Sequence, residues 1–321
     1  AATARTHARP NPWVGAVVVC VDGSVYEGAT QPPGGPHAEI VAMNAARNGG
    51  SDVRGATLYS TLEPCSHTGR TGPCTKAIIS AGVACVVAAI ADPDSHVAGT
   101  GFDALRAAGI EVVTDVLADE VSAQLAPYLH HRRTGRPFVM LKMATTLDAR
   151  TAIPNGPRWI TGEEARVRVH QLRTESDAIV VGSGTVIADD PELTVRHVDG
   201  ASPRRIVLSR SGSVSATAKV QPCDVWSGSL EDLLDSLGTD DVLQLMVEGG
   251  ATVATAFHEQ GLINRYVFHV APIVSGSDSA PGVFVGADAL PLSDCSLVSA
   301  TALGADIEIV LDPIRKKVGT S

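Results

Sequence analysis

The N-terminal part of the chain alternates short apolar runs, rich in Val and Ile, with Ala-rich stretches. Runs bounded by Gly, Pro or Asp predict strands at 14–21, 56–62, 83–91 and 110–113. Stretches with helical spacing predict helices at 37–47, 74–81 and 102–108, the last two followed by Gly82 and Gly109. Because strands and helices alternate, we expect a mainly parallel sheet that is covered by helices on both faces.

A second pattern of the same kind begins after a polar segment. One more helix is predicted at 119–131, and residues His131 to Pro137 then combine charge with Gly and Pro, as linkers do. Beyond this segment the pattern predicts strands at 138–144, 178–182, 205–208, 243–247, 265–271 and 307–311. We therefore predict two α/β domains, residues 1–136 and residues 137–321, with no internal repeat between them.

Capping signals place the helices of the second domain. Thr161 and Glu164 have the spacing of a capping box, which predicts a helix that continues to about Arg173. Two glycines precede a helix predicted at 251–260. The segment 209–230 has little apolar periodicity, so we predict a loop there.

The overall composition limits the class of protein. With 321 residues, of which 44% are apolar and 19% are charged, the chain has enough apolar material for a sizeable core, which excludes a disordered or fibrous protein. It has 25 Lys and Arg against 35 Asp and Glu, a formal net charge of −10. An acidic chain offers no basic field for a phosphodiester backbone, so we expect a small-molecule substrate and no nucleic-acid partner.

Nothing in the sequence indicates a membrane or export segment. No apolar run approaches the roughly 18–20 residues that cross a bilayer, and residues 1–7 contain no apolar stretch of a signal peptide. We therefore expect a cytoplasmic protein with no membrane partner. The sequence begins at Ala1 and not at Met, so we expect native residues to precede it.

One set of residues has the composition of a catalytic zinc site. His37 and Glu39 open a predicted helix, Cys65 follows a predicted strand, and Cys74 begins the next helix. One imidazole and two thiolates are the protein ligands of a catalytic zinc ion whose fourth position is open to water. Glu39 is close enough to reach that water, and a carboxylate that moves a proton from water to a leaving amine is what hydrolytic deamination requires.

Other interpretations of these residues stay open. A His-x-Glu triplet is often a helix start with a surface Glu, and two Cys nine positions apart can form a disulfide or simply pack. Cys65 and Cys74 enclose eight residues, whereas the general base-deaminase pattern encloses two. His67 lies between them and is a rival ligand.

The loop between the two cysteines carries a specific resemblance. Together with His37–Glu39, three stretches of the sequence resemble the deaminase half of the bifunctional riboflavin-biosynthesis deaminase–reductases: Pro10–Gly15, Glu63–Cys74 and Asp92–Asp94. The resemblance implies a cytidine-deaminase-like α/β/α domain. It also implies the substrate, a 2,5-diaminopyrimidinone that carries a phosphoribosylamino group and loses its 2-amino group.

The same resemblance implies substrate contacts in this half. Asn11 and Asp92 would contact the base or the sugar, and Arg70 would meet the phosphoribosyl group. Taken alone, the first two equally fit turn-forming residues and Arg70 a solvated side chain. The sequence departs from the family at Gly72, where Pro is common, and at Thr30, where many members have a His seven residues before the zinc His.

Glycines mark two candidate phosphate sites in the second half. Gly182-Ser183-Gly184 follows a predicted strand but lacks the third Gly of the dinucleotide fingerprint. Gly249 and Gly250 lie between a strand and a helix, where backbone N–H groups can approach an anion. A purely structural turn has the same pattern, so these residues alone leave phosphate binding open.

A second resemblance covers nearly all of residues 137–321. The segments similar to the reductase half of the same family are Leu141–Ala144, Thr146–Arg150, Arg158–Thr161, Gly182–Val186, Ala188–Pro191, Leu193–Arg196 and Val247–Gly250. The resemblance implies a dihydrofolate-reductase-like α/β fold and an NADPH-dependent reaction. Hydride transfer to C1 of the ribose would open the ring to a ribityl chain.

The resemblance also assigns roles to residues. The NADPH site would be lined by Ala144, Trp159, Thr185, Asp189, Gly250, Ala251, Thr252, Val253, Ala254, Thr255 and Ala256. The substrate would be contacted by Pro157, Arg173, Leu193, Arg196 and Glu248, with the two arginines on its phosphate. Lys142 and Glu248 would face the ribose and relay a proton to its ring oxygen. Taken alone, Lys142 also fits an edge charge, Glu248 a surface residue and Trp159 a core residue.

We expect a bifunctional enzyme of riboflavin synthesis, with Zn²⁺ in the first domain and NADPH in the second, that assembles as a homo-oligomer. Two other functions fit part of the pattern. A nucleic-acid-editing or free-nucleoside deaminase joined to an unrelated module would share the zinc residues, although the acidic charge and the Cys spacing argue against it. A non-enzymatic protein with a structural zinc ion would need His67 as a fourth ligand.

Overall fold

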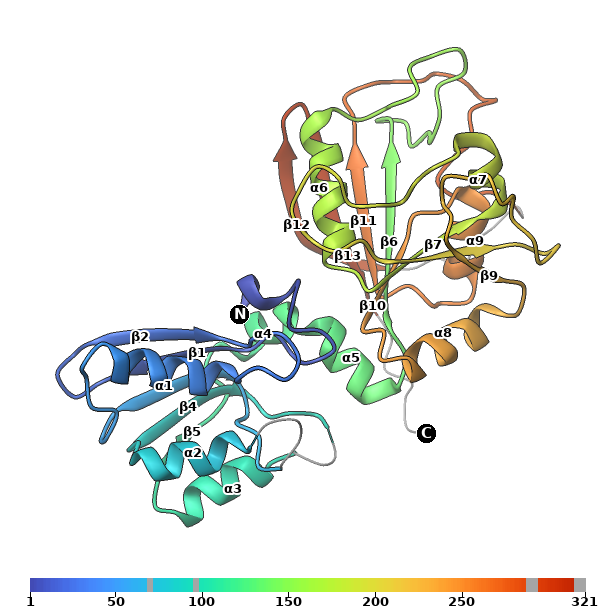
Figure 1. Cartoon of the computed structure of the whole chain (residues 1–321). Helices are drawn as coiled ribbons and strands as arrows, with labels where there is room; N and C mark the ends of the chain where they lie inside the picture. Colours follow the sequence, from blue (N-terminus) through green and yellow to red (C-terminus); the bar gives the residue numbers. More distant parts are fainter. Residues whose placement is uncertain (68–71, 95–97, 287–293, 315–321) are drawn as a thin grey trace, which may run out of the picture. The chain divides into compact units, whose positions relative to one another are not determined.

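The computed structural model describes residues 1–67, 72–94, 98–286 and 294–314. The chain divides into two compact units, Ala1–Arg136 and Pro137–Ser321, and each unit is built on one sheet (Figure 1). In the part of the chain that the structure describes, no helix is both long and apolar enough to cross a membrane.

The first unit contains a mixed five-stranded sheet. Its strands are β1 (Gly15–Val19), β2 (Val25–Ala29), β3 (Thr57–Leu62), β4 (Cys85–Ile90) and β5 (Glu111–Val113), in the order β2-β1-β3-β4-β5. β1 is antiparallel to β2 and β3, while β3, β4 and β5 run parallel. The prediction of a mainly parallel sheet is confirmed only for β3, β4 and β5, because β1 runs antiparallel to β3 and because β2 was not predicted. Gly28 interrupts the apolar pattern by which a strand is predicted in β2. Glycine is required there because a Cβ would lie 2.2 Å from the carbonyl oxygen of Ala38, on the helix that packs closely against β2.

Helices of the first unit are η1 (Ala2–Ala4), α1 (Ala38–Asn48), α2 (Cys74–Ala81), α3 (Thr100–Ala107), α4 (Ala118–Gln124) and α5 (Ala126–Thr134). The predictions of α1, α2 and α3 are confirmed within two residues at each end. α2 ends at Gly82, whose φ of 71° closes the last turn. The single helix predicted at 119–131 is wrong: it is two helices, because Pro127 in the first turn of α5 has no N–H to continue the ladder of α4.

The second unit contains an eight-stranded sheet. Its strands are β6 (Phe138–Thr145), β7 (Ala178–Gly182), β8 (Arg204–Leu208), β9 (Asp224–Trp226), β10 (Gln244–Val247), β11 (Arg265–Val270), β12 (Cys295–Leu303) and β13 (Asp306–Pro313). The order is β12-β13-β11-β6-β10-β7-β8-β9, and the strands from β11 to β9 pair in parallel. The six predicted strands are confirmed. β9 lies in the predicted loop 209–230, and β12 was missed because it is an edge strand with most of its residues exposed.

Two apolar cores cover the two faces of this sheet. The helices are α6 (Glu163–Thr174), α7 (Ser183–Asp189), α8 (Leu230–Thr239) and α9 (Ala251–Glu259). Leu237 of α8 and Phe257 of α9 pack with Leu141 and Val247 on one face. Leu172 of α6 packs on the opposite face. Since side chains alternate along β6 and β10, the residues after Leu141 and Val247 face α6.

The predicted capping box at the start of α6 is wrong. Gly162 is the N-cap residue, and no side chain caps the helix in that position. The Gly162 N–H instead donates to Oδ2 of Asp306 at 2.7 Å, so a carboxylate from β13 binds the backbone N–H at the start of α6. α8 was not predicted; its cap is local, because Oγ of Ser229 accepts from the N–H of Asp232 at 3.0 Å.

Candidate active sites

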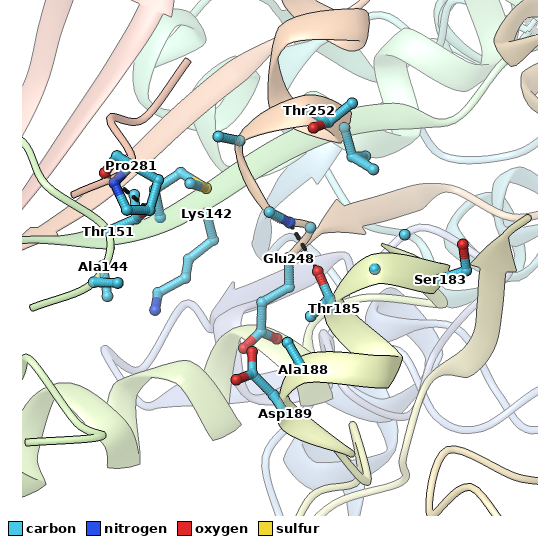
Figure 2. A pocket seen from close by; sticks show the side chains of 18 of the residues that line it. Lys142, Ala144, Thr151, Ser183, Thr185, Ala188, Asp189, Glu248, Thr252 and Pro281 are labelled. Carbon is cyan, nitrogen blue, oxygen red and sulfur yellow. Dashed lines mark hydrogen bonds between the residues drawn. The ribbon is translucent and has the colours of Figure 1, made fainter. Parts of the chain in front are cut away.

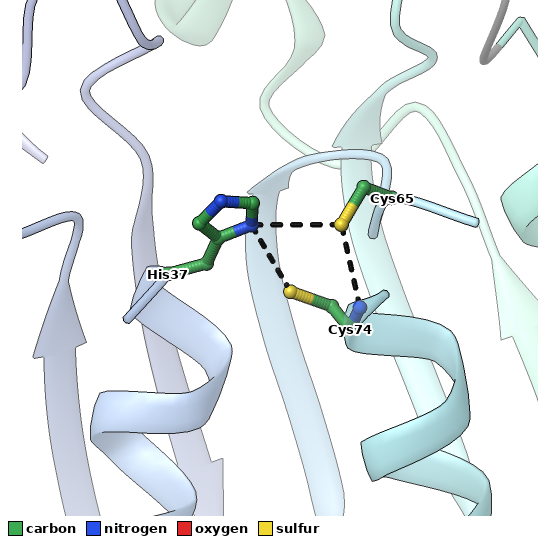
Figure 3. Close-up of side chains that lie close together, drawn as sticks. All are labelled: His37, Cys65 and Cys74. Atoms are coloured by element: carbon green, nitrogen blue, oxygen red, sulfur yellow. Dashed lines mark hydrogen bonds between the residues drawn. The ribbon is translucent and has the colours of Figure 1, made fainter. Parts of the chain in front are cut away.

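A cluster of three residues lies where the central strand of the first sheet, β3, ends: His37, Cys65 and Cys74. His37 is the N-cap of α1, Cys65 follows β3, and Cys74 is the first residue of α2 (Figure 3). Nδ1 of His37 lies 3.5 Å from Sγ of Cys65 and 3.3 Å from Sγ of Cys74, and the three ligand atoms lie within 4.8 Å of one another. The cysteines are free thiols. One nitrogen and two sulfurs at these distances fit a tetrahedral zinc ion with one position left for another ligand.

Local electrostatics favours this donor set. The contact with Cys74 lowers the pKa of the Cys65 thiol to about 4 and raises the pKa of Cys74, because the two sulfurs share one proton. The N–H of Cys74 also donates to Sγ of Cys65 at 3.3 Å, which stabilises a thiolate there. Glu39 is only 4% exposed, and its Oε2 lies 3.5 Å from Sγ of Cys74. Burial raises the pKa of Glu39, so this carboxyl group beside the cluster is suited to hold a proton.

A buried carboxylate fixes the segment that carries Cys65. Oε1 of Glu63 accepts from the N–H groups of Gly101 and Phe102, at 2.8 and 3.3 Å. Oε2 accepts from the N–H groups of Gly99 and Asp92, at 3.0 and 3.2 Å. Glu63 therefore ties the end of β3 to the first turn of α3, which satisfies backbone donors at the start of that helix.

A cavity of about 230 Å³ adjoins the His-Cys-Cys cluster. Asn11 and Asp92 line it, together with Tyr128 and Arg132, which sequence reasoning did not single out. The Tyr128 hydroxyl donates to both carboxylate oxygens of Asp92, at 3.2 and 3.1 Å. His67 also lines the cavity but is exposed and does not belong to the three-residue cluster.

The two departures from the family pattern differ in their surroundings. Thr30 is buried at the cavity, where its Oγ1 accepts from the N–H of Val14 at 3.1 Å, so a backbone-binding hydroxyl occupies this position. Gly72 is exposed, and a Cβ there would meet no heavy atom within 4 Å. Space alone therefore does not require glycine at position 72. Arg70, expected to contact the phosphoribosyl group, lies outside the described residues.

A larger cavity, of about 1310 Å³, opens where parallel strands of the second sheet end. This is the edge at which α/β sheets commonly bind ligands. Its lining includes Lys142 and Ala144 of β6, Gly182 to Thr185 after β7, Ser209 and Arg210 after β8, and Glu248 to Val253 after β10. The cavity is therefore assembled from segments far apart in the sequence.

Lys142 and Glu248 enter this cavity from neighbouring strands. Leu141 of β6 pairs with Val247 of β10, so Lys142 and the residue directly after β10, Glu248, lie on the opposite face of the sheet, the one that α6 covers. Figure 2 shows both side chains in the cavity. Lys142 is 6% exposed and lies on a central strand, which excludes an edge charge. Burial lowers the pKa of Lys142, which makes its ammonium group a better proton donor. Burial alone would raise the pKa of Glu248, but the Arg173 guanidinium lowers it below the usual value, so the carboxylate of Glu248 stays ionised.

Residues of α6 face the same cavity. Arg173 holds Glu248 with both ends of its fork, Nε to Oε2 at 3.0 Å and Nη2 to Oε1 at 2.8 Å. Nδ1 of His170 accepts from the N–H of Arg196 at 3.1 Å. Burial, followed by the charge of Arg173, lowers the pKa of His170 to about 4. Arg196 is half-exposed and bonds Oε2 of Glu192 at 2.6 Å.

Gly249 and Gly250 form the turn between β10 and α9, the glycine corner. A Cβ on Gly249 would lie 2.7 Å from Cβ of Val253, and the N–H of Gly250 donates to Oγ1 of Thr185 at 3.1 Å (Figure 2). The first turn of α9 follows directly. An α-helix leaves its first N–H groups without an intrahelical partner, and the first two residues of α9, Ala251 and Thr252, line the cavity.

Most residues predicted to contact NADPH or the reductase substrate line this cavity. They are Ala144, Pro157, Trp159, Arg173, Thr185, Asp189, Arg196, Glu248, Gly250, Ala251, Thr252, Val253 and Ala256. Trp159 is 60% exposed, which excludes a core residue. The described lining does not include Leu193 or Ala254, which are buried in the apolar cores, or Thr255, whose hydroxyl donates to the carbonyl oxygen of Val285 at 2.9 Å.

Several lining residues were not anticipated. Ser209 and Arg210 follow β8, Trp226 ends β9, and His170 lies one helical turn before Arg173. Ser209 and Arg210 directly follow a predicted strand of a parallel sheet. That position alone marks them as candidates, because side chains after parallel strands commonly meet ligands.

Two family models match the chain, one for each unit. Residues 1–90 match the cytidine and deoxycytidylate deaminase zinc-binding region, and residues 137–309 match the RibD C-terminal domain. The second match covers more than half of the chain. The chain belongs to the RibD family.

Members of the RibD family from several bacteria are similar over most of their length. Riboflavin biosynthesis protein RibD of Mycobacterium tuberculosis is 42% identical over 279 residues, which cover 83% of this chain and 80% of the relative. RibD of Escherichia coli is 37% identical over 311 residues, which cover 84% of each chain.

Solved structures of RibD proteins share the fold of the whole chain. Acinetobacter baumannii RibD has a TM-score of 0.88 and 35% identity, with 97% of this chain and 95% of that one covered. A diaminohydroxyphosphoribosylaminopyrimidine deaminase/5-amino-6-(5-phosphoribosylamino)uracil reductase from Thermotoga maritima has a TM-score of 0.85 and 33% identity, with 96% and 94% covered. This chain is therefore a bifunctional deaminase and reductase of riboflavin biosynthesis, with a cytidine-deaminase-like unit and a RibD C-terminal unit.

Proposed function

We propose that this enzyme deaminates 2,5-diamino-6-(5-phosphoribosylamino)pyrimidin-4-one and then reduces the ribosyl group of the product, 5-amino-6-(5-phosphoribosylamino)uracil, with NADPH. These are the activities named for the Thermotoga maritima protein. The observation that carries the proposal is the coexistence in one chain of a His-Cys-Cys cluster beside a buried Glu and a large cavity with an opposed Lys and Glu.

In the first unit, His37, Cys65 and Cys74 would hold Zn²⁺, which when bound lowers the pKa of water. Glu39 would take a proton from the water that attacks C2 of the base and return it to the departing amine as ammonia leaves. Its buried position and raised pKa support both halves of this proton transfer. Asn11 and Asp92 would orient the base, and Arg70 would bind the phosphoribosyl group.

In the second unit, the glycine corner and the first turn of α9 would bind the phosphates of NADPH, which when bound supplies the hydride. The NADPH contacts would come from Ala144, Trp159, Thr185, Asp189 and the lining residues of 250–256. Arg210, at the end of β8, would meet the phosphate that distinguishes NADPH from NADH.

Lys142 and Glu248 would lie on either side of the ribose. As the hydride adds to C1, the bond from C1 to the ring oxygen breaks and that oxygen takes a proton. The ammonium of Lys142 would give this proton, because burial lowers its pKa. Glu248, which stays ionised, would accept hydrogen bonds from the ribose hydroxyls, and Arg196 would bind the substrate phosphate.

Product analysis tests the proposal. The diaminopyrimidinone phosphate is supplied to the zinc-loaded enzyme with or without NADPH, and the products are identified by mass. Without NADPH, we expect replacement of NH by O and release of ammonia; with NADPH, a product with two further hydrogens and stoichiometric NADPH oxidation. Reduction without prior deamination, or neither change, would overturn the proposed sequence of steps.

A further inference from the structure

Arg173 is bonded in a way that a phosphate ligand alone does not explain. Three of its five N–H groups are already used: two donate to the carboxylate of Glu248, and Nη1 donates to the carbonyl oxygen of Thr194 at 2.9 Å. The side chain of Arg173 is 9% exposed and that of Glu248 is 20% exposed. A bidentate bond between largely buried partners fixes both position and orientation of the carboxylate.

A second cation competes for the same carboxylate. Lys142 faces the cavity from the strand beside Glu248, and its ammonium group is close enough to influence the pKa of Glu248. Yet among the described residues no ion pair joins Lys142 to Glu248, and both carboxylate oxygens of Glu248 bond Arg173. Without that fork, a buried ammonium group and a buried carboxylate on neighbouring strands would attract each other strongly.

The other end of Arg173 is fixed as well. α6 carries the guanidinium, and Thr194 holds it from the loop that also contains Arg196. His170, one turn earlier on α6, binds the same loop through the Arg196 N–H. The fork is thus held between a helix and a loop, so contacts within the protein fix its orientation toward Glu248.

We propose that Arg173 is a positioning residue of the reductase site, which holds Glu248 by both oxygens and keeps it apart from Lys142 so that the ribose fits between them. This inference rests on the proposed function, in which Lys142 and Glu248 face the ribose. It differs from the expected phosphate contact, because the effect of Arg173 is exerted through Glu248.

The experiment separates the two roles by removing the phosphate from the substrate. Reduction of 5-amino-6-(5-phosphoribosylamino)uracil and of its dephosphorylated form is measured for wild type, Arg173→Lys and Arg196→Lys. Lys keeps the charge but cannot form the fork. We expect Arg173→Lys to lower kcat by about tenfold or more with both substrates. For Arg196→Lys we expect a rise in KM with the phosphorylated substrate and a much smaller change with the other.

A double-mutant cycle adds a second criterion. If Arg173 acts through Glu248, then Arg173→Lys should cost less than about threefold in a Glu248→Gln background, because the partner is already altered. Arg204→Lys is the matched control, since Arg204 bonds Asp224 and Asp240 outside the cavity lining and should leave both reductions unchanged. A loss for Arg173→Lys that disappears with the dephosphorylated substrate, or that is undiminished in the Glu248→Gln background, would overturn the inference.

A readout independent of turnover keeps this inference separate from the proposed function. The carboxylate of Glu248 is followed by ¹³C NMR as a function of pH. Arg173→Gln should raise the pKa of Glu248, whereas Arg196→Gln should leave it close to the wild-type value. If the wild type oxidises no NADPH, the proposed function fails, but this titration still tests whether Arg173 holds Glu248. An unchanged pKa of Glu248 in Arg173→Gln would refute that positioning role.

Discussion

The two active sites of this chain are built in opposite ways. In the first unit, three ligand atoms lie within 4.8 Å of one another beside a cavity of about 230 Å³. In the second unit, a cavity of about 1310 Å³ is lined by residues from four strands and the segments between them. A compact metal site concentrates its function in a few side chains, whereas a broad binding site distributes it. The comparison therefore predicts steep losses in the first unit and graded losses in the second.

The largest expected effect is the loss of a zinc ligand. His37→Ala should abolish zinc binding and ammonia release, because two sulfurs alone do not complete the site, while reduction of the deaminated substrate continues. Zinc content by atomic absorption and the two activities are measured together. His67→Ala is the matched control and should retain zinc, since His67 lies outside the ligand cluster. Equal zinc loss in the two variants would indicate a four-ligand structural site.

Next in size is the loss of the proposed proton carrier. Glu39→Gln removes the carboxylate beside the cluster but retains its volume, and deamination should fall by roughly 10²–10⁴. Zinc content should stay at the wild-type level, because Glu39 is not one of the three ligands. An equal fall in reduction by a folded variant would break the separation of the two sites.

A smaller effect is expected at the proposed NADPH end of the large cavity. Arg210→Ala should raise the KM for NADPH by about tenfold and change the KM for NADH little, because one charge-assisted contact to a phosphate is lost. Initial rates with each cofactor give the ratio. The control is Arg204→Ala, on the preceding strand. Equal losses with NADPH and NADH would place Arg210 elsewhere than at the distinguishing phosphate.

The smallest expected effect is a pH dependence of stability. The pKa of His170 is lowered from 6.5 to about 4 by burial and by Arg173, so the unfolded chain takes up this proton first and the folded unit loses stability as the pH falls from about 6.5 to about 4. We expect a contribution on the order of 1 kcal/mol. Calorimetry measures the Tm of the second unit, which is the unfolding transition whose Tm should rise when NADPH is added. His170→Asn should make this Tm depend less on pH. Identical slopes for wild type and variant would contradict this.

Sequence patterns predicted the cores of the two units better than their edges. The central strands β6, β7 and β10 are almost entirely buried and mostly apolar, so their signal is strong. β2 contains no buried residue and β12 is largely exposed, so neither strand has the apolar pattern of a core strand. The entrance of α6 could not be predicted locally, because its partner, Asp306, lies 144 residues away.

The same contrast applies to the sites. The proposed zinc ligands lie at helix starts and after a strand, so their spacing along residues 37–74 was enough to predict the cluster. The second cavity depends on strand order, which places Lys142 beside Glu248 although more than a hundred residues separate them. Only the resemblance to a family suggested this pair, and the bond from Arg173 to Glu248 emerged from the three-dimensional structure alone.

The carboxylate of Glu63 has a consequence for motion in the first unit. It joins the end of β3 to Gly99, Gly101 and Phe102. A Cβ on Gly101 would lie 2.1 Å from the carbonyl oxygen of Pro64, so the two segments are also in close contact. Neither segment can therefore move without the other. Such segments open as one cooperative unit. Amide hydrogen exchange at Gly101 should then slow or speed up together with exchange in the segment that bears Cys65, so α3 stabilises the position of that cysteine from outside the three-residue cluster.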